Sequence, residues 1–465
     1  MGMGKRKRRQ ESLFVATTDL ARSPGHPFYK RLNGLLAEAE FDRWIEARCA
    51  RYYEQEEERG RPSIPPGVYF RMLLVGYFEG IDSQRGIAWR CADSRSLAEF
   101  LGLGPHEPTP DHSTLTNTRK RLPSEVFDEV FQFVLKLAAA KKLSPGKTVG
   151  VDGTTLEANA AMKSIVRRDT GEDWKQYVTR LMRAEGVIDP EHEPTDEELR
   201  RFDKGRKNKR VSNDEWVSPT DPEARITQLK DGRTHLAYKA EHVVDLESEL
   251  ILAAEIRPAT DGDAQTLVDG VVKAEENLAG AGIDVRIADV AADKGYHSAE
   301  TLELCDALGL RTYIPEPKHK HDRVWTDKPA EHKRAVYENR RRMKRAKGKR
   351  LGRLRSERVE RSFAHVCDAG GMRRSWLKGV IDVTKRYLIA AAAHNLGRVL
   401  RKLFGVGKPK TLQGGYGDDV LRALAHLLAR TIAAGAATIE TLRPLAAATT
   451  PIFAGEQTCL KSTGC

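Results

Sequence analysis

Apolar and polar positions from about residue 13 to 142 follow the spacing of helices. In "SIPPGVYFRMLLVGYFEGI" prolines precede an apolar stripe and Gly80 follows it, a pattern typical of a helix that begins after Pro and ends at Gly. Shorter helices are predicted in "SRSLAEFLGLG" and "PDHSTLTNTRKRL", with Ser94 and Asp111 as N-caps. Short helices joined by tight turns predict a helical amino-terminal DNA-binding domain over residues 1–142.

The segment 111–122 is the candidate in this domain for reading a DNA groove. Its predicted helix places Asn117, Arg119 and Lys120 on one polar surface, as the recognition helix of a helix-turn-helix protein does. The solvated face of a helical bundle has the same pattern. This segment taken alone therefore leaves both interpretations open.

A strand pattern begins near residue 147. The β-branched run "KTVGVD" predicts a buried strand that ends at Asp152, and "THLAYKAEHVVDL" and "ELILAAEIRP" predict a hairpin. Another strand, "DVRIADVAAD", ends at Asp293, and "LRTYIPEP" predicts the last one. Helices are predicted in "GDAQTLVDGVVKAEENLAGAG" and in "SAETLELCDALG", the latter capped by Ser298. This order predicts an α/β fold, a mixed sheet flanked by helices.

Two charged segments interrupt the alternation of strands and helices. No strand pattern is visible from about 160 to 230, where we expect a charged helical insertion or a surface loop. A basic insertion at about 316–350 continues into a helix with an apolar stripe. These boundaries predict a core domain over residues 143–405. The Ala- and Leu-rich residues 406–465 predict a helical tail.

Composition narrows the class of partner. The net charge of +12 favours a polyanion, because Lys and Arg release counterions when they bind phosphates. The six cysteines show no CxxC spacing, which favours a reducing compartment over a disulfide framework or a zinc site. No secretory signal and no apolar run long enough to span a bilayer is visible. We therefore expect a cytoplasmic, nucleoid-associated protein without a membrane partner.

Two acids at predicted strand ends are the candidates for catalysis. Asp152 and Asp293 lie far apart in the sequence, but the ends of neighbouring strands in a mixed sheet bring such positions together. Two carboxylates there would suit a hard divalent cation such as Mg²⁺ or Mn²⁺. A single Asp at a strand end is more often a turn or cap residue. The metal hypothesis therefore depends on further ligands.

A third acid is needed to hold two metal ions across a reacting phosphate. Glu357 and Glu360 lie on the helix after the basic insertion, and their spacing alone does not separate them. Glu360 borders the apolar stripe beside Val359. Glu357 lies between Arg355 and Arg358 and is expected to pair with them in solvent. We therefore favour Glu360.

Other groups of polar residues carry less weight. His319, His321 and Asp322 in "KHKHD" are interpreted as part of a flexible basic loop, because no Cys pair accompanies them. His235 and His242 fall on the predicted hairpin and are expected to line it. No glycine-rich phosphate loop of the form GxxxxGK[ST] is present, so we expect no ATP dependence.

Four stretches together resemble the DDE transposases of bacterial insertion sequences: "GVDGTTLEANAAMKS", "HLAYKAEHVVD", "ADKGYHSAE" and "VERSFAHVCDAGGMRRSWLKG". The likeness spans about 13–400 and is closest to the group with a long charged insertion after the first Asp. It implies a ribonuclease H-like core with Asp152, Asp293 and Glu360 as the acidic triad and two Mg²⁺ or Mn²⁺ ions as cofactors. It also implies an enzyme that binds terminal inverted repeats, cleaves DNA and joins the ends to target DNA.

Basic residues near the triad are the predicted contacts to the DNA backbone: Lys294, Arg355, Arg358, Arg373, Arg374 and Lys378. Arg355 matches the arginine that often precedes the Glu in related enzymes. The sequence departs from that pattern in two ways, because no Tyr lies nearby and Cys367 occupies the position of a basic residue after the Glu. Arg373 or Arg374 would replace that cation.

Two other functions remain open. One is a ribonuclease H-like, metal-dependent endonuclease that cuts without joining strands. The other is a catalytically silent DNA-binding relative, which would bind the repeats with the usual salt dependence. For the transposase, a complex of paired ends requires at least two active sites, so we predict a homodimer on double-stranded DNA.

Overall fold

The computed structural model describes residues 16, 24–53, 63–207, 212–229, 232–318 and 323–412. The predicted tail lies outside these residues beyond residue 412, as do His319, His321 and Asp322. None of the described helices is long and apolar enough to cross a membrane.

The amino-terminal region is helical throughout its described residues, as predicted. Its helices are α1 (Pro27–Glu38), α2 (Phe41–Cys49), α3 (Pro66–Glu79), α4 (Gln84–Asp93), α5 (Arg95–Phe100), α6 (His112–Arg121) and α7 (Ser124–Ala140). The predicted ends are confirmed: Ser94 and Asp111 accept backbone N–H bonds as N-caps, and Gly80 ends α3 in the left-handed conformation at φ 72°. The buried helix α3 forms the centre of this region.

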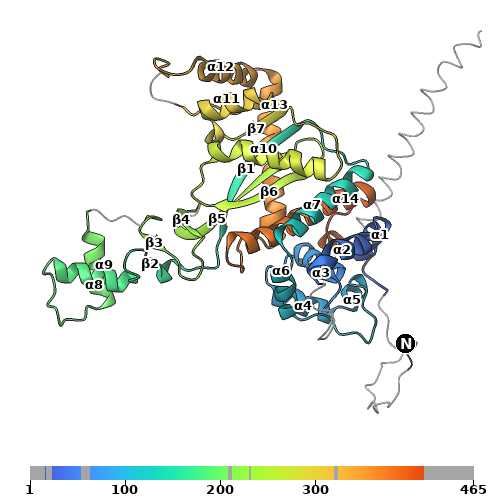
Figure 1. Ribbon diagram of the computed structural model, residues 1–465, viewed down its shortest axis with the longest axis horizontal. Helices are drawn as coiled ribbons and strands as arrows, with labels where there is room; N and C mark the ends of the chain where they lie inside the picture. The colour runs from blue at the N-terminus through green and yellow to red at the C-terminus, as the bar shows by residue number, and fades with distance from the viewer. Residues whose placement is uncertain are drawn as a thin grey trace, which may run out of the picture. The chain divides into compact units, whose positions relative to one another are not determined.

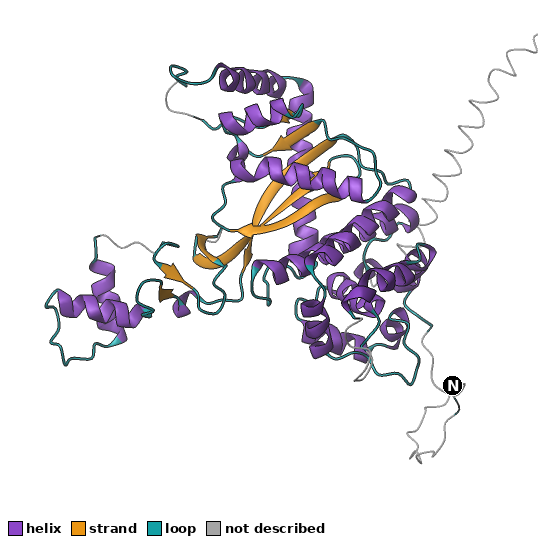
Figure 2. Ribbon diagram, in the orientation of Figure 1, coloured by secondary structure: helices purple, strands orange, loops and turns teal. Residues whose placement is uncertain are grey.

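A mixed sheet forms the core of the second region (Figures 1 and 2). Its strands are β1 (Thr148–Glu157), β4 (Arg225–Gln228), β5 (Thr234–Asp245), β6 (Ile251–Pro258), β7 (Asp289–Ala292) and β8 (Arg311–Tyr313). They lie in the order β4-β5-β1-β7-β8, with β6 also paired to β5. The pairings of β5 are antiparallel, whereas β1, β7 and β8 run parallel to one another. The predicted α/β class, hairpin and order of elements are confirmed.

Helices cover both faces of this sheet. They are α10 (Asp263–Gly280), α11 (Ala299–Ala307), α12 (Ala330–Lys344), α13 (Ala346–Phe363) and α14 (Val380–Phe404). Gly150 of β1 lies against Val359 of α13, whereas Gly270 of α10 lies against Val243 of β5. Val243 pairs with Val151, and Val151 and Gly150 face opposite sides of the sheet because they are neighbours on one strand. Helices α13 and α10 therefore cover opposite faces. We call these the α13 face and the α10 face.

Helix α14, the last α-helix of the described residues, packs against both the sheet and the amino-terminal helices. Helix α14 packs against β6 of the sheet and against α7 and α3 of the amino-terminal region. Between α13 and α14 the chain makes a π-helical turn, Ala364–Asp368, and then an irregular segment. The amino-terminal region and the sheet therefore share one continuous set of packed helices.

The charged insertion has its own small core. Helices α8 (Trp174–Ala184) and α9 (Asp196–Gly205) pack through Val178, Met182 and Leu199, beside the two-stranded pair β2 (Val166–Arg167) and β3 (Trp216–Val217). The prediction of helices here is confirmed. The strands β2, β3 and β4 were not predicted, because runs of two to four residues carry too little alternation to be read.

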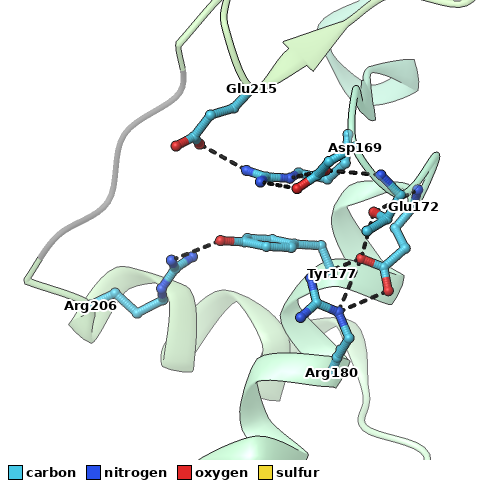
Figure 3. A network of polar contacts seen from close by, with 8 residues as sticks. Asp169, Glu172, Tyr177, Arg180, Arg206 and Glu215 are labelled. Carbon is cyan, nitrogen blue, oxygen red and sulfur yellow. Dashed lines mark hydrogen bonds and ion pairs between the residues drawn. The ribbon is translucent and has the colours of Figure 1, made fainter.

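Arginines surround Tyr177 in this insertion (Figure 3). The guanidinium carbons of Arg167, Arg180 and Arg206 lie 4.9, 5.4 and 5.4 Å from the ring centroid. Arg180 is also paired with Glu172, at 3.0 Å between Nε and Oε1. Each of these cations therefore serves the local fold, which explains why so charged a segment is ordered.

Candidate active site

Asp152 and Asp293 lie side by side on the sheet. Strands β1 and β7 pair in parallel with Val151 opposite Ala292, and Asp152 and Asp293 are the residues that follow these two partners. Asp152 shares the α13 face with Gly150, two residues earlier on the same strand. Asp293, the first residue after β7, lies close enough for its charge to raise the pKa of the Asp152 carboxyl.

The strand that carries Asp152 is longer than predicted. Asp293 follows the last residue of β7, as expected, but β1 continues for five residues past Asp152 to Glu157. The prediction that this strand ends at Asp152 is wrong, because "GTTLE" pairs along its whole length with the long strand β5. Asp152 thus lies on a strand that is fixed on both sides, where its position is well determined.

The electrostatics of Asp152 agree with this proximity. Burial raises the pKa of its carboxyl, and the negative charges of Asp293 and Asp263 raise it further. The Arg355 guanidinium and the Gly153 N–H act in the opposite direction. The two acids thus repel one another, and a cation bound between them would relieve that repulsion.

Arg355 of α13 is the cation that Asp152 contacts directly. Its Nη1 lies 2.7 Å from Oδ2 of Asp152, and Oδ1 of the same carboxylate accepts the Gly153 N–H at 2.9 Å. The methylene Cγ of Arg355 packs against Gly150, where any side chain on β1 would collide. Gly150 thus permits α13 to approach the strand closely enough for this ion pair.

Glu360 lies on the flank of α13 that faces the acids. Arg358 and Arg361 bond to Glu247 and Glu249 at the turn between β5 and β6, beside the amino end of β1. Ser356 and Glu360 occupy the opposite flank of the helix, toward the carboxyl end of β1. Asp152 and Asp293 lie at that end.

The carboxylate of Glu360 does not yet join the pair. It is exposed and accepts a bond from Ser356 Oγ at 3.0 Å. Among the residues that the structure describes, no three His, Cys, Asp or Glu side chains form a group that could hold a metal ion. Asp152 and Asp293 fit a hard divalent cation by their oxygen donors and their proximity, whereas the Glu360 carboxylate is bonded to Ser356.

Glu357 and Glu360 have different surroundings. Glu357 is exposed and paired with Arg361, on the side of α13 away from Ser356. The expectation that Glu357 pairs with Arg355 and Arg358 is wrong, because Arg355 binds Asp152 and Arg358 binds the Glu247 carbonyl. Its partner is the arginine four residues further along the helix.

His242, which was expected to line the hairpin, is a structural residue of this site. It lies on β5 directly opposite Asp152 and is fully buried. Its Nδ1 lies 2.8 Å from Ser362 Oγ, its Nε2 lies 2.9 Å from Tyr387 Oη, and its ring stacks on Phe363 with centroids 4.1 Å apart. It thereby fixes α13 and α14 on the sheet beside Asp152. Only the strand register reveals this role.

A buried polar network supports the Asp293 loop from the α10 face. Lys239 Nζ lies 3.2 Å from Glu241 Oε2 and 2.7 Å from Asp263 Oδ1. The Tyr296 hydroxyl, three residues after Asp293, donates to the same Glu241 oxygen at 3.2 Å. Gly295 packs so closely on Asp263 that a Cβ would lie 2.5 Å from Oδ2. The loop is thus held by charged residues whose roles were not predicted from "HLAYKAEHVVD".

The predicted DNA-contacting residues near the triad are mostly exposed. Lys294, Arg373, Arg374 and Lys378 are exposed, and Arg355 and Arg358 are partly buried. Arg373 reaches β1, where its Nη1 donates to Thr154 Oγ1 at 3.2 Å. Cys367, in the position of the family's basic residue, is buried against the Tyr387 hydroxyl at 3.6 Å.

One predicted DNA contact in the amino-terminal region is misplaced. Asn117 and Lys120 of α6 are exposed, as expected. Arg119 is only 7% exposed, and its Nε lies 3.1 Å from Asp382 Oδ2 of α14. The expectation that Arg119 shares the polar surface is wrong, because it faces α14 rather than solvent.

Two known families match the chain. Residues 18–121 match the family described as Transposase domain (DUF772), and residues 189–396 match the family described as Transposase DDE domain. The second match includes Asp293 and Glu360 and begins after Asp152. No curated protein and no solved structure matches the chain.

The fold and both matches agree on the class. The DDE domain implies a ribonuclease H-like fold, and the sheet has the mixed order and flanking helices expected of one. The two family matches together support a DDE transposase of insertion-sequence type.

Proposed function

We propose that this transposase cleaves DNA at the ends of an insertion sequence and joins the freed ends to target DNA at a site formed by Asp152, Asp293 and Glu360. The observation that carries the proposal is that Asp152 and Asp293 directly follow Val151 and Ala292, which are partners on two parallel strands, and lie close enough for their charges to interact. Two neighbouring carboxylates, with few cations to balance them, favour a site for divalent metal ions.

The acids of this chain hold the metal site rather than transferring protons. Asp152 and Asp293 supply carboxylate oxygens, and Glu360 supplies a third after its side chain leaves Ser356. Two Mg²⁺ or Mn²⁺ ions, when bound, would activate the attacking water or DNA 3′-hydroxyl and stabilise the leaving oxygen. The carboxylates must be ionised for this role.

The arginines near the site hold the scissile strand. Arg355 exchanges Asp152 for a DNA phosphate as the strand enters, which releases the Asp152 oxygen at the moment the substrate is in place. Arg373 lies two residues further along the same face of β1, through its bond to Thr154, and is the cation that replaces the missing basic residue at Cys367. Arg374, Lys378, Lys294 and Arg358 extend the basic surface.

Recognition of the terminal repeats is assigned to a separate domain. We place it in residues 1–142, through the exposed Asn117 and Lys120 of α6, with catalysis in residues 143–405. Double-stranded DNA is the partner, both as transposon end and as target. Because paired ends require two active sites, the active form is a homodimer on DNA.

Cleavage of inverted-repeat DNA in the presence of Mg²⁺ tests the proposal. Wild-type protein is compared with Asp152→Asn, Asp293→Asn and Glu360→Gln, and Glu357→Gln is the matched control on the same helix. We expect the first three to lose cleavage and joining while retaining DNA binding, and the control to keep both. Full activity of any of the three removes that residue from the site.

The same assay separates the alternatives. Nicking without joined products indicates an endonuclease of the ribonuclease H type. Binding of the repeats without metal-dependent cleavage by the wild type indicates a catalytically silent relative.

A further inference from the structure

The segment 373–378 runs along the end of β1 beyond the active site. The Glu157 N–H donates to the Arg373 carbonyl at 3.1 Å, and the Ser375 N–H donates to the Glu157 carbonyl at 2.9 Å. Arg374 therefore lies next to Glu157 as a short parallel extension of the sheet. Through this pairing the segment is held at a fixed distance from Asp152.

Trp376 in this segment is fixed yet exposed. Its indole N–H donates to Asp82 Oδ2 at 2.7 Å, and its carbonyl accepts from Asn159 Nδ2 at 2.9 Å. The residue is nevertheless 46% exposed. A tryptophan held by polar bonds at its edge and backbone keeps an apolar ring surface in solvent, which costs free energy unless a ligand covers it.

Basic residues flank Trp376 along the chain, and one of them contacts its ring. The Arg374 guanidinium carbon lies 4.7 Å from the Trp376 ring centroid, and Lys378 is exposed two residues later. Arg373, three residues earlier, is paired with Asp368 and donates to Thr154 Oγ1 of β1. An aromatic ring between basic residues is the arrangement by which proteins bind nucleobases together with their phosphates.

We propose that Trp376 stacks on a nucleobase of the DNA strand that lies in the active site, while Arg373, Arg374 and Lys378 bind the phosphates on either side of that base. The proposal rests on the proposed function, because it takes its DNA from the same site. Stacking is tolerant of sequence, so this contact contributes affinity and alignment of the strand rather than recognition of a particular base.

Strand β1 gives the position of that base. From Asp152 to Glu157 the strand advances five residues, or about 16 Å at 3.3 Å per residue. That length equals roughly five base steps at 3.4 Å each. The stacked base therefore lies within roughly five nucleotides of the reacting phosphate.

Replacing bases one at a time tests the contact. Binding of the inverted-repeat end is measured in EDTA, with an abasic nucleotide at each of the first six or so positions from the terminus. At one position, we expect the abasic nucleotide to lower the affinity of the wild type about five- to a hundredfold. Trp376→Ala should bind intact DNA more weakly than the wild type by the same factor, and the abasic nucleotide at that position should not weaken it further. If every abasic position weakens both proteins equally, the stacking proposal is overturned.

Further variants separate stacking from a structural role. Trp376→Phe keeps a stacking ring without the N–H, and we expect it to bind nearly as tightly as wild type; Asp82→Ala, which removes the partner, should also bind well. If Trp376 serves only to clamp Asp82, both variants will bind as weakly as Trp376→Ala. Leu304→Ala on α11, at an apolar residue that is 46% exposed like Trp376, is the matched control and should bind as the wild type does.

The outcome does not depend on catalysis. Binding in EDTA requires no cleavage, so the abasic test can succeed even if the wild type proves catalytically silent. Conversely, the other result is that the wild type cleaves DNA with metal while no abasic position lowers its affinity more than that of Trp376→Ala. That result overturns the stacking contact and leaves the proposed function intact.

Discussion

The two faces of the sheet around β1 differ in how completely their charged side chains are paired. On the α10 face, Lys239 sits between Glu241 and Asp263, and hydroxyls of Thr266 and Tyr296 complete the hydrogen bonding of one Glu241 oxygen. On the opposite side, among the described residues, Asp152 and its neighbour Asp293 have one cation in direct contact, Arg355, which binds Asp152. The buried charges on the first face are largely matched, whereas those on the second are not.

This difference separates structure from function. A buried charge that is matched by partners stabilises the position of its elements and needs nothing from outside. Two acids with one arginine leave negative charge that a bound cation can balance, and burial raises the pKa of Asp152 as the cost of that arrangement. The alternation of a strand places the supporting network and the proposed catalytic pair back to back.

The largest expected effect comes from removing the charge of Asp152, one of the two incompletely paired acids. Asp152→Asn should lower metal-dependent cleavage by at least about a thousandfold, because a metal ligand is lost. Its free energy of unfolding, measured by urea titration, should stay within about 1 kcal/mol of wild type, since lost attraction to Arg355 offsets relieved repulsion from Asp293. Glu157→Gln at the end of the same strand is the control. A large loss of stability in Asp152→Asn would place this acid among the structural charges instead.

Removing the cation of the α10 face should have the opposite result, a large loss of stability. Lys239→Met leaves Glu241 and Asp263 without their shared cation and should lower the free energy of unfolding by about 3–5 kcal/mol. The double variant Lys239→Met/Glu241→Gln should recover part of that loss, because the remaining amide can still accept from Thr266. Losses that simply add in the double variant would show that the two residues do not act as a pair.

The sequence predicted the helices and strands well and the contacts between distant side chains poorly. The helices, the hairpin and the strand that ends before Asp293 follow from periodicity and caps, which are local. The length of β1 past Asp152 does not, because it depends on pairing with β5 rather than on its own residues. Asp152 and Asp293 were found because acids stand out in apolar runs. The role of His242 beyond lining the hairpin, and that of Lys239, were not predicted, since their importance lies in which residues face them across the sheet.

His242 allows a test of the α13 face by pH. Burial lowers its pKa to about 3, so the folded protein keeps it neutral while the unfolded chain binds a proton below about 6.5. The unfolded state therefore binds more protons between these values, and stability present above pH 6.5 or so is lost as pH falls. His242→Gln should make the slope of unfolding free energy against pH shallower by up to about 1.4 kcal/mol per unit. Identical slopes would show that the imidazole is not held neutral.

The smallest expected effect concerns the bond that holds Glu360 away from the acids. Ser356 Oγ donates to the exposed Glu360 carboxylate, and a bond of this kind contributes about 0.5–1.5 kcal/mol at most. Ser356→Ala should therefore change the Mg²⁺ concentration needed for half-maximal cleavage by no more than about tenfold, and in the direction of tighter use of the metal. A requirement for more Mg²⁺ would mean that Ser356 orients Glu360 for the metal ions rather than restraining it. The acids beside α13 would then be partly arranged for the metal ions in advance, just as the charged side chains of the α10 face are fixed by their own ion pairs.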